Sequence, residues 1–542
     1  MPNHRAQLAS AGCDRASSSR VPVASLHEIW TQVLAVCARM WRQRPAAWRT
    51  AAALAGMASL ACSEPVAPIG DQMPPEILLP VETDSVQSSV DVENHLVGDL
   101  GWRDQQTSDL SALAVWASPY VVSVGDTLDL FVHAVAPKVS LEVYRLGWYG
   151  GIGGRLVHSQ AAIRGGIQSL CTDAQSGLVA CPWRRSARIV MPHDWTGGVY
   201  LLKTRDAQGH TWSYPFVLRS RRPHRLTAVV NQFSWQAYNK WGGVSFYSTD
   251  PRTSYTYPKI SFNRPYLGRG GMTATGGAGE AGGSNDLPAI RWLEANSYDI
   301  GYISDLDLAL QGADLENIHT LIFVGHDEYW TWSEFDRVEA LRDAGTHLAF
   351  LSANSAYWNI RLAPGAVTGR RGETMISFKY QADPEAATPE QTTTKFRNPP
   401  LNRPESQLVG AMYQGLLPHG SHPPMVVPPD SLLGPEARGF LDAAGLTSGD
   451  TLRIDAGTEG DEYVPTSAGT PPGTQMLLRA IQPVSGPSPR YFHSTFYIAP
   501  SGAGVWDAGT NFWAAYLDGE RKAANGDVGQ LTRVVLSWMD TH

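Results

Sequence analysis

The sequence predicts two folded parts in series, an N-terminal part built from β-strands and a C-terminal α/β part with a mostly parallel sheet. Between residues 110 and 219, short segments of alternating polarity are separated by turn residues, a pattern typical of antiparallel strands. From Leu226 onwards, apolar strand-like runs alternate with helical patterns, which is typical of a doubly wound layer. A chain of 542 residues also exceeds the size of one hydrophobic core. We therefore expect two or three domains.

Composition indicates a globular protein with an acidic body. Hydrophobic residues make up 43% of the chain and aromatic residues 10%, which is too apolar for a disordered protein. The formal net charge is −8, but residues 1–61 hold seven Arg, no Lys and two acidic residues. The rest of the chain therefore carries a charge of −13. This charge argues against nucleic acid or anionic lipid as the main partner.

The first 61 residues have the pattern of an export signal. Three arginines precede the apolar run Thr50 to Ala61, and the segment Ser59-Leu-Ala-Cys62 resembles a bacterial lipoprotein processing site, although such sites prefer Leu where this chain has Ser59. We expect export to the periplasm or cell surface with Cys62 as a lipid anchor, and an ordinary secretory signal is the alternative. Met40 is a natural start for this signal, so residues 1–39 are expected to precede the true start. Residues 62–107 are predicted to form a flexible tether.

Only two cysteines follow Cys62 in the chain, Cys171 and Cys181. A lone pair of cysteines in an oxidising compartment predicts a disulfide. Closing so short a loop would stabilise the fold by roughly 2.5–3 kcal/mol. Two free buried thiols are the alternative.

Residues 108–220 are predicted to form a β-sandwich of immunoglobulin-like size. Strands are expected at Ala112–Trp116, Thr127–Val135, Ser140–Tyr144, Arg155–His158, Arg188–Met191, Val199–Thr204 and Tyr214–Leu218. The Gly-rich run that begins at Gly147 precedes a strand-like segment rather than a helix. It is therefore a poor match to a dinucleotide-binding fingerprint, in which a helix follows the glycines.

Residues 221–542 are predicted to form the α/β domain, whose outline looks like a class I glutamine-amidotransferase sheet. Buried strands are expected at Leu226–Val230, Tyr298–Ser304, Thr320–Val324 and His347–Leu351, helices or helical turns at Ser234–Lys240 and Asp286–Asn296, later strands at Gln475–Ala480, Arg490–Tyr497 and Gly504–Asp507, and a closing helix at Val528–Met539. A Gly-rich loop (268–283) and a Pro-rich loop (383–435) are expected to interrupt this order.

One strand–helix–strand unit within this domain carries polar residues at both strand ends. The strand ending at Val324 is followed by Gly325, His326, Asp327 and Glu328, and the next strand leads to Asn354. Between them, Thr331 and Glu334 form a capping-box pattern and Gly345 marks the helix end. Ligands of open α/β sheets bind at the carboxyl ends of the strands. We therefore expect the functional site at this loop, although an ordinary exposed polar loop would show the same pattern.

Several reaction types lack their sequence signatures. No Cys lies beyond residue 181, which excludes a thiol triad in the α/β domain. The sequence contains no Gly-x-Ser-x-Gly, no His-Glu-x-x-His and no Cys-x-x-Cys, which removes the usual signs of a serine hydrolase, a zinc protease and a structural zinc site. The candidates that remain are His326, Glu328, Asn354 and the tyrosines upstream of them.

Five segments together resemble the C-terminal region of the N,N-dimethylformamidase large (beta) subunit family. They are Tyr144–Val157, Gly197–Tyr200, Trp235–Gly243, Gly325–Trp330 and Ala353–Trp358, and the resemblance covers roughly residues 108–540. It implies an amide hydrolase in which two tyrosinates and one glutamate hold a mononuclear iron, with a histidine and an asparagine nearby.

Carried over motif by motif, the resemblance makes Glu328 the carboxylate ligand of the iron. It makes His326 a catalytic neighbour and Asn354 an amide that orients substrate or water. It points to Tyr200 and Tyr238 as the tyrosine ligands, with Tyr247 as a rival to Tyr238. Packing of the phenol rings, in the sandwich core for Tyr200 and against the sheet for the other two, is the alternative role.

Such a site would be chemically coherent. Trivalent iron prefers anionic oxygen donors, and a bound metal ion polarises an amide carbonyl and activates water. His326 could carry the proton to the leaving amine, and Asn354 could donate to the developing oxyanion.

The resemblance also leaves alternatives open. The formamidase works with a small subunit that this chain does not supply. The resemblance therefore does not identify the substrate of this chain. We expect a small-molecule amide as the partner. The alternatives are a non-catalytic surface protein that binds carbohydrate or peptide, and a metal-free hydrolase that uses Glu328 as base with His326.

Overall fold

The computed structural model describes most of the chain after residue 88. The described residues are 76–77, 89–103, 109, 111–169, 171, 177–221, 224–250, 255–267, 286–313, 315, 317–416, 423–455, 459–465, 469–482, 490–519 and 525–542. The predicted export signal, Cys62, most of the predicted tether and the Gly-rich loop lie outside them. None of the helices within the described segments is both long enough and apolar enough to cross a membrane.

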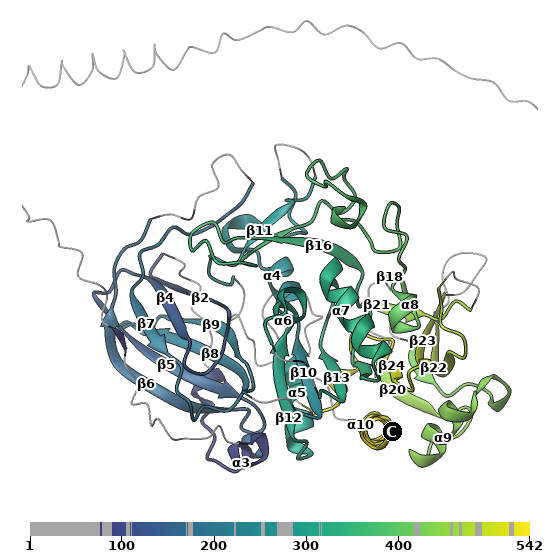
Figure 1. The fold of residues 1–542 in the computed structure, drawn as a ribbon. Helices are drawn as coiled ribbons and strands as arrows, with labels where there is room; N and C mark the ends of the chain where they lie inside the picture. Colours follow the sequence, from purple (N-terminus) through teal and green to yellow (C-terminus); the bar gives the residue numbers. More distant parts are fainter. Residues whose placement is uncertain are drawn as a thin grey trace, which may run out of the picture. The chain divides into compact units, whose positions relative to one another are not determined.

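Two sheets form the N-terminal β region (Figure 1). One has the order β1 (Glu76–Ile77), β7 (Ala187–Val190), β4 (Thr127–Ala134), β2 (Leu113–Ser118), and the other β3 (Val121–Val122), β9 (Thr211–Leu218), β8 (Gly198–Arg205), β5 (Lys138–Leu146), β6 (Gly154–Arg164). Each strand that the sequence predicts here is a strand in the structure. The immunoglobulin-like topology stays a prediction.

Two strands of this region, one of them at the edge of its sheet, are buried on both faces, unlike the strands of a sandwich that has one solvent-exposed face. All residues of β2 and β9 are buried. Inside the region, the rings of Trp116 and Phe131 stack at a centroid distance of 3.8 Å. On the other side, the hydroxyl of Tyr214 in β9 donates to the backbone oxygen of Phe262, which belongs to the C-terminal region. Both strands are therefore mostly apolar, because each face packs against protein.

A nine-stranded sheet forms the centre of the C-terminal α/β region (Figure 1). Its order is β12 (Ile300–Ser304), β10 (Leu226–Val230), β13 (Thr320–Val324), β15 (His347–Phe350), β24 (Gly504–Asp507), β23 (Arg490–Ile498), β22 (Gln475–Gln482), β19 (Pro424–Val426), β20 (Thr451–Asp455). The first five strands are parallel, as the sequence predicts. The last four pair antiparallel, so the sheet is mixed rather than mostly parallel. The amidotransferase-like topology stays a prediction.

Helices and two smaller sheets complete the region. The helices are α4 (Gln232–Tyr238), α5 (Asp286–Ala295), α6 (Asp305–Leu310), α7 (Trp332–Asp343), α9 (Pro435–Ala443) and α10 (Gly526–Thr541). The capping box of Thr331 and Glu334 is confirmed at the start of α7. A four-stranded sheet has the order β11 (Lys259–Ser261), β17 (Thr374–Ile376), β16 (Trp358–Ala363), β14 (Tyr329–Thr331), and β18 (Met412–Leu416) pairs with β21 (Glu459–Glu462).

The Pro-rich stretch 383–435 is more structured than an irregular loop. It contains the short helix α8 (Ser406–Val409), strand β18 and strand β19. These strands pair with partners from later in the chain, β21 and β20. Because those partners lie far away in sequence, a local pattern could not reveal the pairing.

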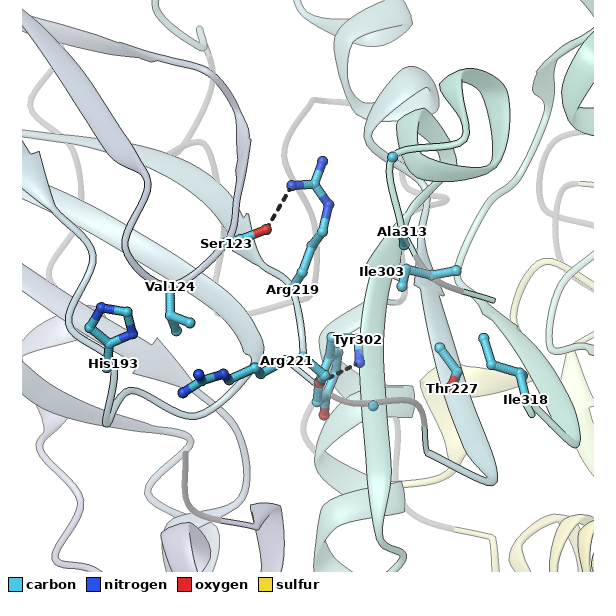
Figure 2. A pocket seen from close by; sticks show the side chains of 13 residues that line it. Ser123, Val124, His193, Arg219, Arg221, Thr227, Tyr302, Ile303, Ala313 and Ile318 are labelled. Atoms are coloured by element: carbon cyan, nitrogen blue, oxygen red, sulfur yellow. Dashed lines mark hydrogen bonds between the residues drawn. The ribbon is translucent and has the colours of Figure 1, made fainter. Parts of the chain in front are cut away.

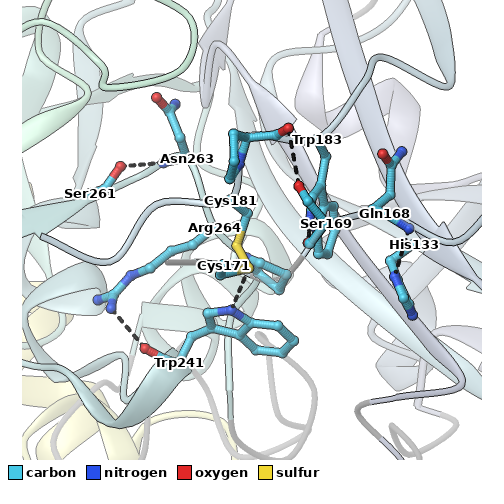
Figure 3. Close-up of a disulfide and its surroundings, with 12 residues drawn as sticks. His133, Gln168, Ser169, Cys171, Cys181, Trp183, Trp241, Ser261, Asn263 and Arg264 are labelled. Atoms are coloured by element: carbon cyan, nitrogen blue, oxygen red, sulfur yellow. Dashed lines mark hydrogen bonds between the residues drawn. A yellow bond between two sulfur atoms is a disulfide. The ribbon is translucent and has the colours of Figure 1, made fainter. Parts of the chain in front are cut away.

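The predicted disulfide between Cys171 and Cys181 is confirmed (Figure 3). It closes a loop in the connection between β6 and β7, with a Cα–Cα distance of 4.1 Å. The indole nitrogen of Trp241 donates to the Cys171 sulfur at 3.3 Å, and the backbone N–H of Cys181 donates to the Asn263 oxygen at 2.8 Å. The disulfide thus holds the N-terminal β region against the segment that follows α4.

Candidate functional site

Glu328 lies at the carboxyl end of the parallel strands, where the sequence places it. Strand β13 ends at Val324, and Gly325 turns the chain with a φ of +80°. A Cβ atom at Gly325 would lie 2.7 Å from the carboxyl group of Asp286, so the turn requires glycine. The next three residues, His326, Asp327 and Glu328, are all buried, and Glu328 is only 3% exposed. They form a buried polar loop, not an exposed one.

Three polar side chains converge on the Glu328 carboxylate. The hydroxyl of Tyr238 donates to Oε2 at 2.8 Å, and that of Tyr247 lies 2.9 Å from Oε1 and 2.6 Å from Oε2. The two hydroxyls are also 2.9 Å apart. The indole nitrogen of Trp358 donates to Oε1 at 2.9 Å. Two phenol oxygens and one carboxylate therefore meet at a single point.

Helix α4 and the loop that follows it bring the two tyrosines to this point. It starts directly after β10, at the carboxyl end of that strand, and Tyr238 is its last residue. The chain then turns through Gly242 and Gly243, both with positive φ, and returns with Tyr247, whose ring stacks on Tyr238 at 4.4 Å. The Ser234 hydroxyl of α4 accepts the backbone N–H of Glu328 at 3.1 Å. This hydrogen bond fixes α4 relative to the loop that carries Glu328.

His326 lies between two carboxylates. Its Nε2 atom is 3.0 Å from Glu459 Oε2 and 3.5 Å from Glu328 Oε2. Burial opposes protonation of His326, but the negative charges of Glu459 and Glu328 outweigh burial and raise its pKa to about 9. Burial alone would raise the pKa of Glu328, but the hydrogen bond and charge of His326 lower it. The arrangement therefore favours a histidinium beside a glutamate anion.

Asn354 lies beside this pair. Its backbone has a left-handed φ of +60°, and its N–H donates to the Asp461 carboxylate at 2.9 Å. Its side chain hydrogen-bonds Glu459. Within the described segments, the amide oxygen of Asn354 has no hydrogen-bond partner. It can therefore still accept from a bound molecule.

Lys379 and Glu459 belong to the site but were not predicted. Lys379 is only 4% exposed, and its ammonium lies 3.7 Å from the centre of the Tyr247 ring. Burial lowers the pKa of Lys379 to about 8, although the charges of Glu328 and Glu459 act in the opposite direction. Lys379 follows β17 and Glu459 begins β21, both short strands far from Glu328 in sequence, and no motif marks either residue.

Tyr200 is not part of this cluster, contrary to the expectation from the resemblance. It lies in β8 of the N-terminal region with no exposed surface, and its hydroxyl donates to the backbone oxygen of Thr196 at 2.6 Å. Its ring stacks on Trp195. These contacts give Tyr200 the role of a core tyrosine. Tyr247, the rival to Tyr238, instead joins Tyr238 at Glu328.

The donor set at Glu328 suits a hard metal ion. No group of three or more His, Cys, Asp or Glu side chains is placed to hold a metal within the described part of the chain. Two phenols and a carboxylate supply oxygen donors of the kind that trivalent iron prefers. Burial and the charge of Glu328 raise the pKa of Tyr238 and of Tyr247 well above the ordinary value. A cation would reverse that effect, because it favours the phenolate form.

A separate cavity of about 300 Å³ lies where the N-terminal sheets meet β12 (Figure 2). Its wall includes His193, Arg219 and Tyr302. The Arg219 guanidinium is paired, with Asp307 at 2.5 Å and the Ser123 hydroxyl at 3.2 Å. None of the side chains gathered around Glu328 lines this cavity. We place the candidate site at Glu328, because the converging donors are there.

Comparison with known proteins gives a consistent result. A family model described as N,N-dimethylformamidase beta subunit-like, C-terminal, matches residues 140–527, which include every residue of the cluster. An N,N-dimethylformamidase beta subunit from Paracoccus aminophilus is 25% identical over 222 residues, which are 34% of this chain and 29% of that protein. One from Alcaligenes sp is 34% identical over 80 residues, 15% of this chain and 10% of that protein. The matches thus span less than a third of either relative, while the family model covers most of this chain. The chain belongs to the N,N-dimethylformamidase beta subunit-like, C-terminal family.

Proposed function

We propose that the protein hydrolyses the C–N bond of an amide at Glu328, with Glu328, Tyr238 and Tyr247 holding a mononuclear iron. The observation that carries this proposal is the convergence of two phenol hydroxyls on one buried carboxylate, at distances of 2.6–2.9 Å. Family membership supports the reaction class. The named substrate of the two relatives, N,N-dimethylformamide, belongs to those proteins, and a small amide is our proposal for this chain.

The iron, when bound, would polarise the amide carbonyl and lower the pKa of water. The chain's own residues would carry out the proton transfers. Hydrolysis joins the water oxygen to the carbonyl carbon and breaks the C–N bond, so the nitrogen must gain a proton as it leaves. His326, protonated between Glu459 and Glu328, is placed to donate that proton. Glu459, whose pKa burial raises, can accept a proton from the attacking water.

Asn354 and Lys379 would position the reacting groups. The side chain of Asn354 contacts Glu459, so it can orient the amide relative to the acid–base pair. The Lys379 ammonium over the Tyr247 ring favours the ionised phenol. Because Lys379 is buried, its charge acts at low dielectric and with little screening.

Iron content and colour test the proposal directly. Purified protein grown with iron should hold about one iron per chain and show a visible tyrosinate-to-iron charge-transfer band. Tyr238→Phe and Tyr247→Phe should each weaken or shift the band and lower amide hydrolysis. Tyr200→Phe is the matched control, because its hydroxyl bonds only within the N-terminal region. Iron-free, colourless protein that still hydrolyses amides would rule out an iron-dependent reaction.

The two alternatives give different results in the same experiment. A metal-free hydrolase would remain active without iron, but the lowered pKa of Glu328 makes it a weak base, which counts against this alternative. A non-catalytic binding protein would be inactive on every amide even when loaded with iron.

A further inference from the structure

An aromatic rim connects the buried Glu328 to the protein surface. We use this name for Tyr357, Trp358 and Tyr380. Trp358 donates to Glu328, and its ring contacts both other rings at centroid distances of 5.0 Å. Tyr380 is 77% exposed, whereas Trp358 is 2% exposed. Tyr357 is also buried, at 6% exposed, so a molecule whose carbonyl reaches Glu328 could rest its remaining part on the Tyr380 ring.

One lysine ammonium, that of Lys395, lies close to all three rings of the rim. The Nζ atom of Lys395 is 4.9 Å from the centre of the Tyr357 ring, 5.4 Å from Tyr380 and 5.8 Å from Trp358. An isolated bridge between Trp358 and Lys395 fixes the two backbones side by side. Within the described part of the chain, Lys395 forms no ion pair, whereas its neighbour Arg397 pairs with Glu405.

Lys395 is half-buried, and none of the ion pairs among the described residues includes it. The chain has 51 acidic and 43 basic residues, yet none of the described carboxylates pairs with Lys395. Burial, followed by the positive charge of Arg397, lowers the pKa of Lys395. Contact with aromatic rings offsets part of this cost, but less of it than a hydrogen bond to an anion would. A bound anion would therefore supply a counter-charge that none of the described residues gives Lys395.

We propose that the substrate of the Glu328 site is an amide that also bears a carboxylate, which Lys395 binds while a flat or apolar group rests on the exposed ring of Tyr380. This inference rests on the proposed function and specifies its substrate class. The Trp358 ring lies 5.1 Å from the Lys379 ammonium on the inner side and 5.8 Å from the Lys395 ammonium. Both ammoniums thus lie within 6 Å of one ring, a span that one small molecule can cover.

A matched pair of substrates tests the charge requirement. N-formylphenylalanine and N-formyl-2-phenylethylamine share the amide and the ring, and only the first carries a carboxylate. We expect kcat/KM of the iron-loaded enzyme to be about tenfold higher for the charged amide, mainly through KM. Lys395→Met should reduce this preference about tenfold, and Lys395→Arg should keep most of it. Lys138→Met, at an exposed lysine of β5, is the matched control and should leave the preference unchanged.

Binding without turnover separates this inference from the proposed function. Titration calorimetry with 3-phenylpropionate should show a Kd that Lys395→Met weakens about tenfold. A protein that binds 3-phenylpropionate through Lys395 but hydrolyses no amide would overturn the proposed function only. Equal kcat/KM for the two formamides, or an equal loss on both in Lys395→Met, would overturn the substrate class while leaving amide hydrolysis intact.

Discussion

Gly325 shows how a single residue fixes the geometry of the site. Its φ of +80° and the carboxyl group of Asp286, 2.7 Å from a Cβ at this position, both exclude a side chain. We expect Gly325→Ala to lower the free energy of unfolding by roughly 2–4 kcal/mol, from left-handed strain and overpacking together. Denaturant unfolding and iron content of the variant measure the effect.

Gly345, at the end of α7, is the matched control for this prediction. It also has a positive φ, +107°, but nothing lies within 4 Å of its Cβ position. Gly345→Ala should therefore cost only the backbone strain, about 1–2 kcal/mol, and should leave iron binding unchanged. If both variants lose the same stability, contact with Asp286 does not constrain the loop.

At the scale of elements, His347 in β15 predicts a loss of stability in acid. Its Nδ1 accepts the backbone N–H of Gly504 at 2.8 Å, which requires the neutral ring. Burial and the positive charges of His319, His542 and Arg225 lower the pKa of His347 to about 4. The unfolded chain binds this proton near pH 6.5 and the folded chain near pH 4, so stability falls as the pH drops through that window.

A single substitution isolates the contribution of His347. The oxygen of Asn can accept the Gly504 N–H but does not titrate, so His347→Asn should reduce the loss of unfolding free energy between pH 7 and pH 5 by roughly 1–2 kcal/mol. Urea unfolding at the two pH values measures it. The remaining pH dependence should include His493, whose pKa burial lowers to about 4. An unchanged pH dependence in His347→Asn would contradict this account.

The elements also show what the sequence could and could not reveal. The parallel strands were predictable because each is a continuous apolar run that ends in Gly or a polar residue, as at Val324 and Gly325. Strands β14, β16 and β17 have three to six residues and pair with distant segments, so they have no local period. Glu459 and Lys379 join the site through such strands. Tyr200 was predicted as a ligand because its Gly-Gly-Val-Tyr segment resembles the family. Its hydroxyl instead donates to a backbone oxygen within the N-terminal core.

At the scale of the whole molecule, a buried ion pair joins the two regions. Arg145 of β5 and Glu294 of α5 are 2.7 Å apart, and neither side chain has exposed surface. The Tyr302 hydroxyl of β12 also donates to Glu294, at 2.5 Å, and Arg145 donates to the backbone oxygen of Gly197. The negative charge of Glu294 raises the pKa of Arg145 despite the opposing effect of burial. Both charges are thus satisfied only when the regions are docked.

Removal of one partner should therefore lower the free energy of unfolding more than removal of both. Arg145→Met leaves Glu294 buried without a counter-ion, and we expect a loss of about 3–5 kcal/mol in unfolding free energy. The double variant Arg145→Met/Glu294→Met should regain most of that loss, because an apolar pair needs no compensation. The exposed pair Arg225–Asp540 is the control, and Arg225→Met should cost no more than about 1 kcal/mol. Denaturant midpoints of the wild type and these three variants test the prediction, and a double variant as unstable as Arg145→Met would show that Arg145 acts mainly through Gly197 and packing.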